Sequence, residues 1–217
     1  MTTTDVETTV DGGCERGYGA TTCLWGTEPE PLVLALADYR ALAGAEILDA
    51  GCGEGRNAGH IARLGARVTA LDVSAAALAH AEATWPDETG ISWHQADVLS
   101  WPMPATGYDA VVCDSVLHWL SGPEEVTAAV AKLQAATRPG GLHMICSFND
   151  RLLDYDNHVT PPRCLLPHDR LLALYTGWTI LEEHDEDTVS SHVDVPELHH
   201  HSVTKFIARR PLTAESH

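Results

Sequence analysis

Short apolar runs alternate with amphipathic stretches along most of the chain. The apolar runs are typical of buried β-strands and lie at residues 45–50, 67–71, 91–94, 108–113 and 142–147. The amphipathic stretches have helical spacing and lie at residues 31–42, 56–64, 75–85 and 123–136. Strands separated by about one helix each predict βαβ units, and therefore a doubly wound, parallel sheet of the α/β class.

This rhythm changes in the last third of the chain. Arg-Pro-Gly-Gly at residues 138–141 predicts a turn, and the prolines of residues 149–167 predict a long loop. A short helix at residues 167–175 and two strands at residues 178–184 and 203–209 complete the pattern. The acidic, histidine-rich residues 184–201 lie between these two strands.

Residues 1–28 are expected to form a separate N-terminal arm. Residues 1–20 consist mainly of Thr, Gly and acidic residues without periodicity, so we expect a segment that is flexible or ordered by a ligand. Trp25 either covers that ligand as a lid or packs on the first helix, and the glycines at residues 17–19 favour the lid. The single domain is expected to span residues 29–212.

The charge of the chain excludes several classes of partner. Thirteen basic residues face 31 acidic ones, which gives a formal net charge of −18. Nucleic acids and anionic membrane surfaces bind basic patches, so neither is expected as a partner. The first residues lack the basic and apolar regions of a secretory signal, and the six cysteines form no C-x-x-C pair. We therefore expect a cytoplasmic protein, as a monomer or homodimer.

The glycine-rich segment ILDAGCGEGRN, residues 47–57, is the strongest motif of the sequence. A strand that ends in Asp49 leads through Gly51, Gly53 and Gly55 into a helix. Glycines allow a sharp turn and a close approach of the backbone to a ligand, and a helix N-terminus presents free N–H groups. An acid at the strand tip repels a pyrophosphate and suits a cationic amine, so this motif favours a ligand with an ammonium group over NAD.

Aspartates also follow the next three strands. Asp72 stands 23 residues after Asp49, at the position where a carboxylate accepts ribose hydroxyls in dinucleotide sites. Asp97 follows the third strand and Asp114 the fourth. A single acid at a strand end can be a simple cap. Four in succession favour a binding site along the carboxyl edge of the sheet.

These motifs together resemble the class I S-adenosylmethionine-dependent methyltransferases. The resemblance rests on residues 47–57, Asp72, residues 96–98, residues 108–114 and the Arg-Pro-Gly-Gly segment. It implies a Rossmann-like sheet of seven strands, mostly parallel with the last strand antiparallel, and helices on both faces. It also implies S-adenosyl-L-methionine as the cofactor.

The resemblance assigns a role to each motif. It places Gly51 and Gly53 against the methionine moiety, Asp72 on the ribose, and Asp97 with Val98 at the adenine. The backbone of Asp114 and Ser115 would lie near the amino-acid end. The full set of cofactor-binding candidates is Trp25, Asp49, Gly51, Cys52, Gly53, Arg56, Asn57, Asp72, Val73, Asp97, Val98, Asp114 and Ser115.

A narrower resemblance is to the small tellurite-resistance (thiopurine-like) methyltransferases. It rests on Gly-Arg-Asn at residues 55–57 and on residues 171–178, 185–187, 197–199 and 206–210. The family's Glu-Leu-His-Arg segment reads Glu-Leu-His-His here, so its arginine anion clamp is missing. This departure disfavours a tellurite or selenite substrate and favours a small organic acceptor of secondary metabolism, contacted by loops within residues 149–201.

Methyl transfer requires a base only when the acceptor must lose a proton. His118 follows the fourth strand, where the acceptor would meet the methyl group, and His199 lies in the C-terminal segment. Each can instead be structural: His118 as a packed core histidine and His199 as a solvated strand residue. We expect one of them to act as base or to orient the acceptor, with His118 slightly preferred.

The histidine run at residues 199–201 raises the question of a metal site. In a strand His199 and His201 would share a face, and His184 or His192 could join them. No cysteine or carboxylate stands at a tight ligand spacing, so we expect surface histidines and no metal.

The function expected from the sequence is methyl transfer from S-adenosylmethionine to a small-molecule acceptor by in-line displacement. The alternative is a protein that keeps the cofactor site and works as a non-methylating cyclase or sensor. Both require the glycine loop and Asp72, and they differ in whether S-adenosylhomocysteine is formed.

Overall fold

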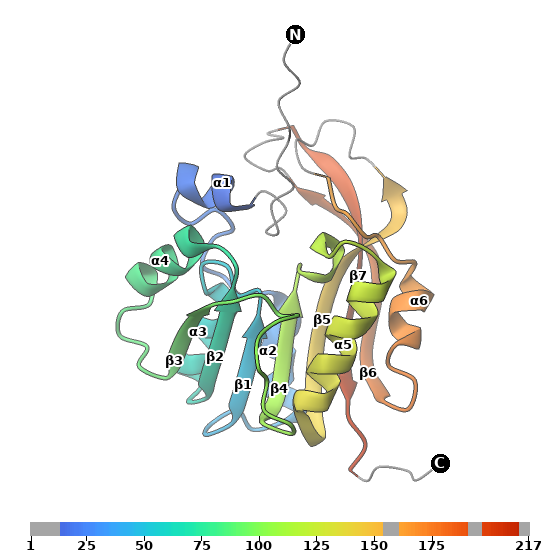
Figure 1. The fold of residues 1–217 in the computed structure, drawn as a ribbon, viewed down its shortest axis with the longest axis horizontal. Helices are drawn as coiled ribbons and strands as arrows, with labels where there is room; N and C mark the ends of the chain where they lie inside the picture. The colour runs from blue at the N-terminus through green and yellow to red at the C-terminus, as the bar shows by residue number, and fades with distance from the viewer. Residues whose placement is uncertain (1–13, 154–160, 191–196, 213–217) are drawn as a thin grey trace.

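The computed structural model describes residues 14–153, 161–190 and 197–212. Seven strands form one sheet in the order β3-β2-β1-β4-β5-β7-β6 (Figure 1). They are β1 (Glu46–Ala50), β2 (Arg67–Asp72), β3 (Ile91–Gln95), β4 (Tyr108–Asp114), β5 (Thr137–Leu153), β6 (Thr179–Ser190) and β7 (His199–Arg209). Strand β7 runs antiparallel to both β5 and β6, and the pairs among β1 to β5 are parallel. The expected sheet, with its last strand antiparallel, is confirmed.

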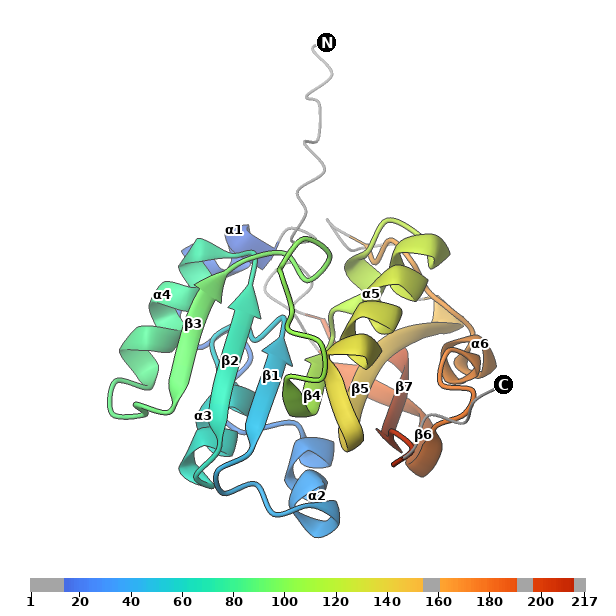
Figure 2. The same ribbon diagram turned by 60° about the horizontal axis from the view of Figure 1, so that its bottom comes forward.

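Helices cover both faces of the sheet (Figure 2). They are α1 (Cys14–Ala20), α2 (Pro31–Tyr39), α3 (Arg56–Arg63), α4 (Ala75–Thr84), α5 (Pro123–Ala136) and α6 (His168–Ala173), with a 3-10 turn η1 (Leu117–Trp119). Apolar residues of α2 and α3 pack on one face, and those of α5 and α6 pack on the other. Strand β4 is buried along its whole length, as expected of a central parallel strand.

The predicted turn at residues 138–141 is wrong, because this segment belongs to β5. The β4–β5 register shifts between Tyr108 and Ala110, so the extra residues are absorbed as an irregularity in the ladder. Two bonds hold the segment against the chain after β7: Gly140 N–H donates to the carbonyl of Arg210 at 3.0 Å, and Arg210 N–H to that of Gly141 at 2.8 Å.

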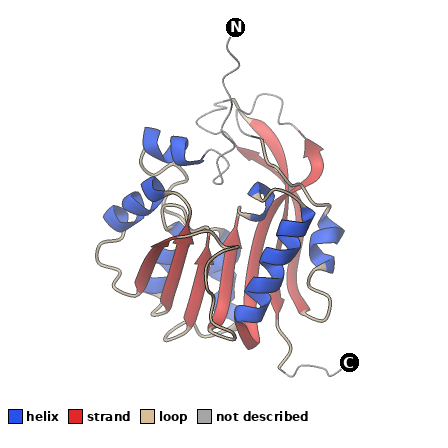
Figure 3. Cartoon of the chain, viewed as in Figure 1, coloured by secondary structure: helices blue, strands red, loops and turns tan. Residues whose placement is uncertain are grey.

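The acidic, histidine-rich stretch is strand over most of its described length, which the sequence pattern missed. Residues of β6 from His184 to Ser190 pair with β7 from Lys205 back to His199. Strand β6 lies at the sheet edge, where charged side chains face solvent and protect the exposed backbone from further pairing. A run of acidic residues therefore belongs to an edge strand here, and Figure 3 draws this part of the chain as strand.

The N-terminal arm is more regular than the sequence predicts. Its residues 14–20 form α1, which packs against α4. Tyr18 of this helix is buried, and its ring packs against the rest of the protein although the residues around it are mostly polar. Residues 1–13 of the arm, residues 154–160 of the expected loop and His192 lie outside the described residues.

Candidate functional site

The glycine loop connects β1 to α3 and is tightly constrained. Gly51, Gly53 and Gly55 have φ angles of 76°, 53° and 79°, in the left-handed region that favours glycine. A Cβ atom on Gly51 would lie 2.1 Å from a methyl carbon of Val116, and one on Gly53 would lie 2.8 Å from the Tyr18 hydroxyl. The loop is thus enclosed between the segment after β4 and the N-terminal arm.

Asp49, at the end of β1, is a buried carboxylate with an unusual environment. Its side chain is 0% exposed, and neither oxygen makes a hydrogen bond of good geometry with the part of the chain that the structure describes, although the backbone N–H of Ala58 lies near enough to lower the pKa of the carboxyl. Burial, followed by the nearby carboxylates Asp114 and Asp72, raises its pKa to about 8. A cation placed beside Asp49 would relieve this cost.

Asp72, at the end of β2, faces the glycine loop. One carboxylate oxygen accepts the N–H of Gly53 at 2.8 Å, and the other accepts that of Ser74, also at 2.8 Å. Gly51 N–H and Cys52 N–H both donate to the carbonyl of Leu71, at 2.7 and 2.8 Å. These bonds fix the carboxylate against the loop.

The third acid of the series follows β3. Asp97 accepts the N–H of Leu99 at 2.7 Å and caps the turn that follows. Val98 beside it is buried against the sheet. Val73 follows directly after Asp72, and its carbonyl accepts a hydrogen bond from the Gln95 side chain at 3.1 Å. The tips of β2 and β3 are therefore linked.

Asp114, the fourth acid of the series, accepts hydrogen bonds from the first residues of α3. One oxygen of Asp114 accepts bonds from Arg56 at 2.8 Å and Asn57 at 3.1 Å, and the other accepts the Ser115 hydroxyl at 3.0 Å. Ser115 has a φ of 61°, and its N–H donates to the carbonyl of Cys146 at 2.9 Å. A non-glycine residue in this conformation is held by its surroundings, and such positions cluster at functional sites.

The N-terminal arm is fastened to the glycine loop by Glu54. The Glu54 carboxylate accepts the N–H groups of Cys23 at 2.7 Å and Leu24 at 2.6 Å, and it contacts His80 Nδ1 at 3.0 Å. Trp25, the expected lid residue, is 43% exposed, and its indole N–H donates to the Tyr18 hydroxyl at 3.2 Å.

Sequence reasoning missed Tyr18 and Glu54. Glu54 could have been found as the one acid inside the glycine loop, and Tyr18 as the one aromatic residue between Gly17 and Gly19.

His118 is a buried, neutral histidine. Burial lowers its pKa to about 3. Its Nδ1 accepts the backbone N–H of Phe148 at 3.2 Å and lies 3.3 Å from the Ser147 hydroxyl. Because a backbone N–H is always the donor, the proton of the neutral ring is on Nε2. His118 therefore presents a donor at Nε2 and has no available lone pair there.

His199 has the opposite tautomer. Its Nδ1 lies 2.8 Å from the carbonyl oxygen of Glu197. A carbonyl only accepts, so Nδ1 carries the proton and Nε2 keeps the lone pair. His199 is 7% exposed, so it is a buried residue of β7 and not a solvated strand residue.

The two histidines belong to one column of rings. His118 stacks on Phe148 at 4.4 Å, Phe148 stacks on His201 at 4.5 Å, and His201 meets His199 edge-on at 4.5 Å. The fold thus connects His118, which follows β4, with His199 of β7 through rings on β5 and β7.

Neither a metal site nor a membrane helix is found in the described part of the chain. No three His, Cys, Asp or Glu side chains there are grouped to hold a metal ion. His184 lies 3.6 Å from Glu182 on the edge strand. None of the helices among these residues is long and apolar enough to span a membrane.

Comparisons with known proteins agree with this geometry. Residues 47–141 match the family described as "Methyltransferase domain". An uncharacterized methyltransferase of Mycobacterium tuberculosis is 34% identical over 115 residues, which are 52% of this chain and 56% of the relative. The chain spans about half the length of the curated relatives that it matches.

Solved structures give the same result. A protein from work on the conversion of a disulfide bond into a thioacetal group during echinomycin biosynthesis matches with a TM-score of 0.71 and 25% identity, over 94% of this chain and 92% of the other. TehB from Haemophilus influenzae also matches with a TM-score of 0.71, at 22% identity, over 83% and 62% of the two chains. Residues 47–141 thus resemble a methyltransferase domain, and the fold is the one seen in S-adenosylmethionine-dependent methyltransferases of known structure.

Proposed function

We propose that this chain transfers the methyl group of S-adenosylmethionine to a small-molecule acceptor. The observation that carries the proposal is the fully buried Asp49 carboxylate beside a glycine loop whose Gly53 N–H donates to Asp72. A cofactor with a positively charged ammonium group would compensate Asp49, and the hydroxyls of a ribose would donate to the Asp72 carboxylate. The echinomycin-related structure supports a small-molecule acceptor.

The residues present fit this cofactor. Asp49 would face the cationic end, Gly51 and Gly53 would allow the close approach, and Asp72 would accept the ribose hydroxyls. Asp97 and Val98 would contact the adenine at the neighbouring strand tip. Cys52, Arg56, Asn57, Val73 and Ser115 complete the proposed binding set. When bound, S-adenosylmethionine supplies a methyl carbon that is already activated by its sulfonium, so the protein mainly positions the nucleophile and excludes water.

The arm would exclude that water. Tyr18 and Trp25 are held over the glycine loop through Glu54, which receives two backbone N–H groups of the arm. The Tyr18 hydroxyl lies so close to the loop that a Cβ atom on Gly53 would clash with it, at 2.8 Å. The arm would therefore act as the lid of the cofactor site.

Of the two histidines, His199 has the tautomer that proton removal requires. Its Nδ1–H bond to the Glu197 carbonyl places the ring lone pair on Nε2, whereas the Nδ1 of His118 accepts a backbone N–H. Of the two roles that the sequence leaves open for His118, its hydrogen bonds favour orienting the acceptor over acting as base. We infer that His118 orients the acceptor through Nε2–H and that His199 takes the proton of acceptors that carry one.

Formation of S-adenosylhomocysteine tests the proposal against the cyclase or sensor alternative. The purified chain is incubated with methyl-labelled S-adenosylmethionine and a panel of thiols, amines, phenols and chalcogen oxyanions. We expect acceptor-dependent S-adenosylhomocysteine in equal amount to labelled product. Saturable cofactor binding with no S-adenosylhomocysteine from any class of acceptor would favour the alternative.

A further inference from the structure

Residues 14–25 of the N-terminal arm form a compact unit, which we call the arm unit. Gly17 of α1 packs closely on the side chain of Leu24, since a Cβ atom on Gly17 would lie 3.1 Å from a methyl carbon of that leucine. The Trp25 indole N–H donates to the Tyr18 hydroxyl at 3.2 Å. These contacts join α1 to the turn that follows it, so the arm unit is expected to move as one body.

The arm unit rests on the glycine loop and on α4 through contacts at its surface. Glu54 of the loop accepts the N–H groups of Cys23 at 2.7 Å and Leu24 at 2.6 Å. The Ser74 hydroxyl, at the start of α4, donates to the Glu15 carboxylate of α1. These contacts lie between the arm unit and the body of the protein, so the arm unit can leave its place while the sheet stays intact.

The start of α2, by contrast, is fixed to the body by side chains from α3 and β7. Glu30 N–H donates to the Asn57 side chain of α3 at 2.9 Å, and the Glu30 carboxylate lies 3.0 Å from the Lys205 ammonium of β7. Glu186 of β6 also holds Lys205, at 3.2 Å. Pro31 occupies the start of α2, where its ring fixes φ. Helix α2 therefore stays with the body when the arm unit moves.

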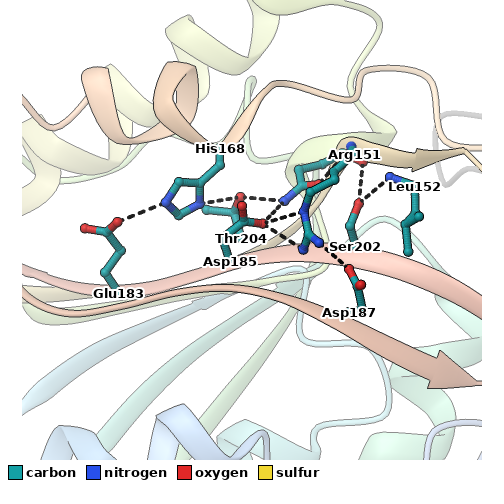
Figure 4. A network of polar contacts seen from close by, with 9 residues as sticks. Arg151, Leu152, His168, Glu183, Asp185, Asp187, Ser202 and Thr204 are labelled. Carbon is teal, nitrogen blue, oxygen red and sulfur yellow. Dashed lines mark hydrogen bonds and ion pairs between the residues drawn. The ribbon is translucent and has the colours of Figure 1, made fainter.

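The opposite face of β7 carries a polar network that holds this strand in place (Figure 4). Thr204 accepts a bond from Asn149 at 3.1 Å and contacts His168 of α6 at 3.1 Å. Asn149 of β5 also donates to Asp185 of β6 at 2.9 Å. Successive residues of a strand point to opposite faces, so Lys205 points to the other side, toward the start of α2. It does so from a strand that its neighbours hold in place.

Residues 26–28 connect the arm unit to the fixed start of α2, and they are exposed. Gly26 has a φ of 76°, in the left-handed region, and a Cβ atom there would have open space around it. Within the described part of the chain, Thr27 and Glu28 make no hydrogen bond to the body of the protein. Hinges are short loop segments that absorb a change in backbone angles, and residues 26–28 have this character.

We propose that the arm unit swings about Gly26, and that this movement admits S-adenosylmethionine and releases S-adenosylhomocysteine. In the closed position Tyr18 lies against Gly53, where a Cβ atom would lie 2.8 Å from its hydroxyl. The arm unit thus covers the loop to which the methionine moiety is assigned. The inference rests on the proposed function, since it names the moving gate of the same cofactor site.

Gly26→Ala tests the hinge. The closed position requires a φ of 76° at residue 26, which is unfavourable for alanine, whereas the open position does not require it. The open space around Gly26 means that the added methyl group causes no clash. The full chain is loaded with tritiated S-adenosylhomocysteine and mixed with an excess of the unlabelled compound, and the label that stays bound is followed by rapid filtration. We expect release to be about fivefold faster in the variant.

Gly44→Ala is the matched control. Gly44 has a φ of 74°, and a Cβ atom there would also have open space around it. It precedes β1, whereas the glycine loop follows β1, so it lies at the opposite edge of the sheet from the arm unit. The variant therefore carries the same backbone strain away from the proposed hinge. It should keep the native release rate.

Amide hydrogen exchange locates the segment that moves. The N–H groups of Cys23 and Leu24 bond to Glu54 only while the arm unit is closed, so their exchange reports opening. We expect S-adenosylhomocysteine to slow exchange at these two residues severalfold and to leave residues 31–39 of α2 unchanged. Without ligand, both N–H groups should exchange faster in Gly26→Ala than in the native chain.

The outcomes distinguish this inference from the proposed function. Native release from Gly26→Ala, an equal acceleration in Gly44→Ala, or equal protection of residues 31–39 by the ligand would overturn the inference. Failure of S-adenosylhomocysteine to bind the native chain would instead contradict the proposed function. Exchange without ligand then decides on the hinge: faster exchange at Cys23 and Leu24 in Gly26→Ala alone supports it, and equal exchange in all three proteins overturns it.

Discussion

Asp49 shows how one residue can couple cofactor binding to folding. A carboxylate that is fully buried near two other acids favours its protonated form, and its pKa of about 8 lies above the ordinary value of 3.8. The stability that this group contributes is therefore full below pH 3.8 and is lost as the pH rises through 8. The native chain is therefore less stable at high pH, and the same buried carboxylate makes the site suitable for a cation.

The first prediction follows from that pKa. Asp49→Asn removes the cost of ionisation, so the cofactor-free variant should melt at a higher temperature than the native chain at pH 8.5, with a smaller difference at pH 5. Differential scanning fluorimetry measures both. An unchanged or lower melting temperature at pH 8.5 would show that Asp49 does not carry this cost.

Cofactor affinity should show the reverse dependence. Between pH 6 and 7.5 the affinity of the native chain for S-adenosylmethionine should rise, because ionised Asp49 pairs with the ammonium group. In Asp49→Asn this rise should disappear and binding should be weaker throughout. Calorimetric titrations at several pH values provide the test, and a flat native profile would contradict the role given to Asp49.

Asp72 is the residue to which the ribose is assigned. Asp72→Ala should lower S-adenosylmethionine affinity at least tenfold, or about 1.4 kcal/mol, because charge-assisted hydrogen bonds are lost. The variant also frees the N–H groups of Gly53 and Ser74, so circular dichroism must show that the fold is kept. Equal affinity in a folded variant would refute the assignment.

The two histidines make opposite predictions for the pH profile. With a hydroxyl or ammonium acceptor, His199→Gln should lower kcat about 10² or more, as for loss of a general base. His118→Gln keeps an N–H near the position of Nε2 and should retain most of kcat with an unchanged pH profile. A lost ionisation between pH 5 and 8 in His118→Gln, with His199→Gln fully active, would reverse the roles.

At the scale of elements, α1 and the turn after it behave as one unit. The backbone N–H groups of Cys23 and Leu24 reach Glu54 in the glycine loop, and Tyr18 is buried against the same loop. The connection between arm and loop is thus a carboxylate that accepts two N–H bonds, and breaking it should release the arm without disturbing the sheet.

Limited proteolysis measures that release. In the native chain, cleavage within residues 14–28 should be slow and should be slowed further by S-adenosylhomocysteine. Glu54→Gln weakens both bonds and should speed cleavage severalfold, while Glu46→Gln, which alters the exposed ion pair with Arg67, should not. Equal cleavage of all three proteins would leave the arm without a role as lid.

Elements with strong hydrophobic periodicity were predictable from sequence, and elements defined by long-range pairing were not. The strands at the centre of the sheet are buried runs, so β1, β2 and β4 could be read directly. Residues 184–190 of β6 and 199–205 of β7 are mostly polar, and they form strands only because they pair with each other. Helix α1 likewise depends on the burial of Tyr18.

At the scale of the whole molecule, the site residues also divide into those that a local pattern indicates and those that only long-range contacts bring together. Acids at successive strand tips converge in any parallel sheet, so Asp49, Asp72 and Asp114 could be grouped from sequence. The column of rings formed by His118, Phe148, His201 and His199 joins segments of η1, β5 and β7 that are far apart in the chain, and no local pattern indicates it. Tautomers also depend on hydrogen bonds that only the folded chain makes.

The central claim is that the whole fold is organised around S-adenosylmethionine, and calorimetric titration with that cofactor tests it most directly. We expect saturable binding at one site per chain, with at least tenfold weaker binding to Asp72→Ala. NAD should not compete, because Asp49 repels a pyrophosphate. No saturable heat with S-adenosylmethionine, or equal binding of NAD, would contradict the account.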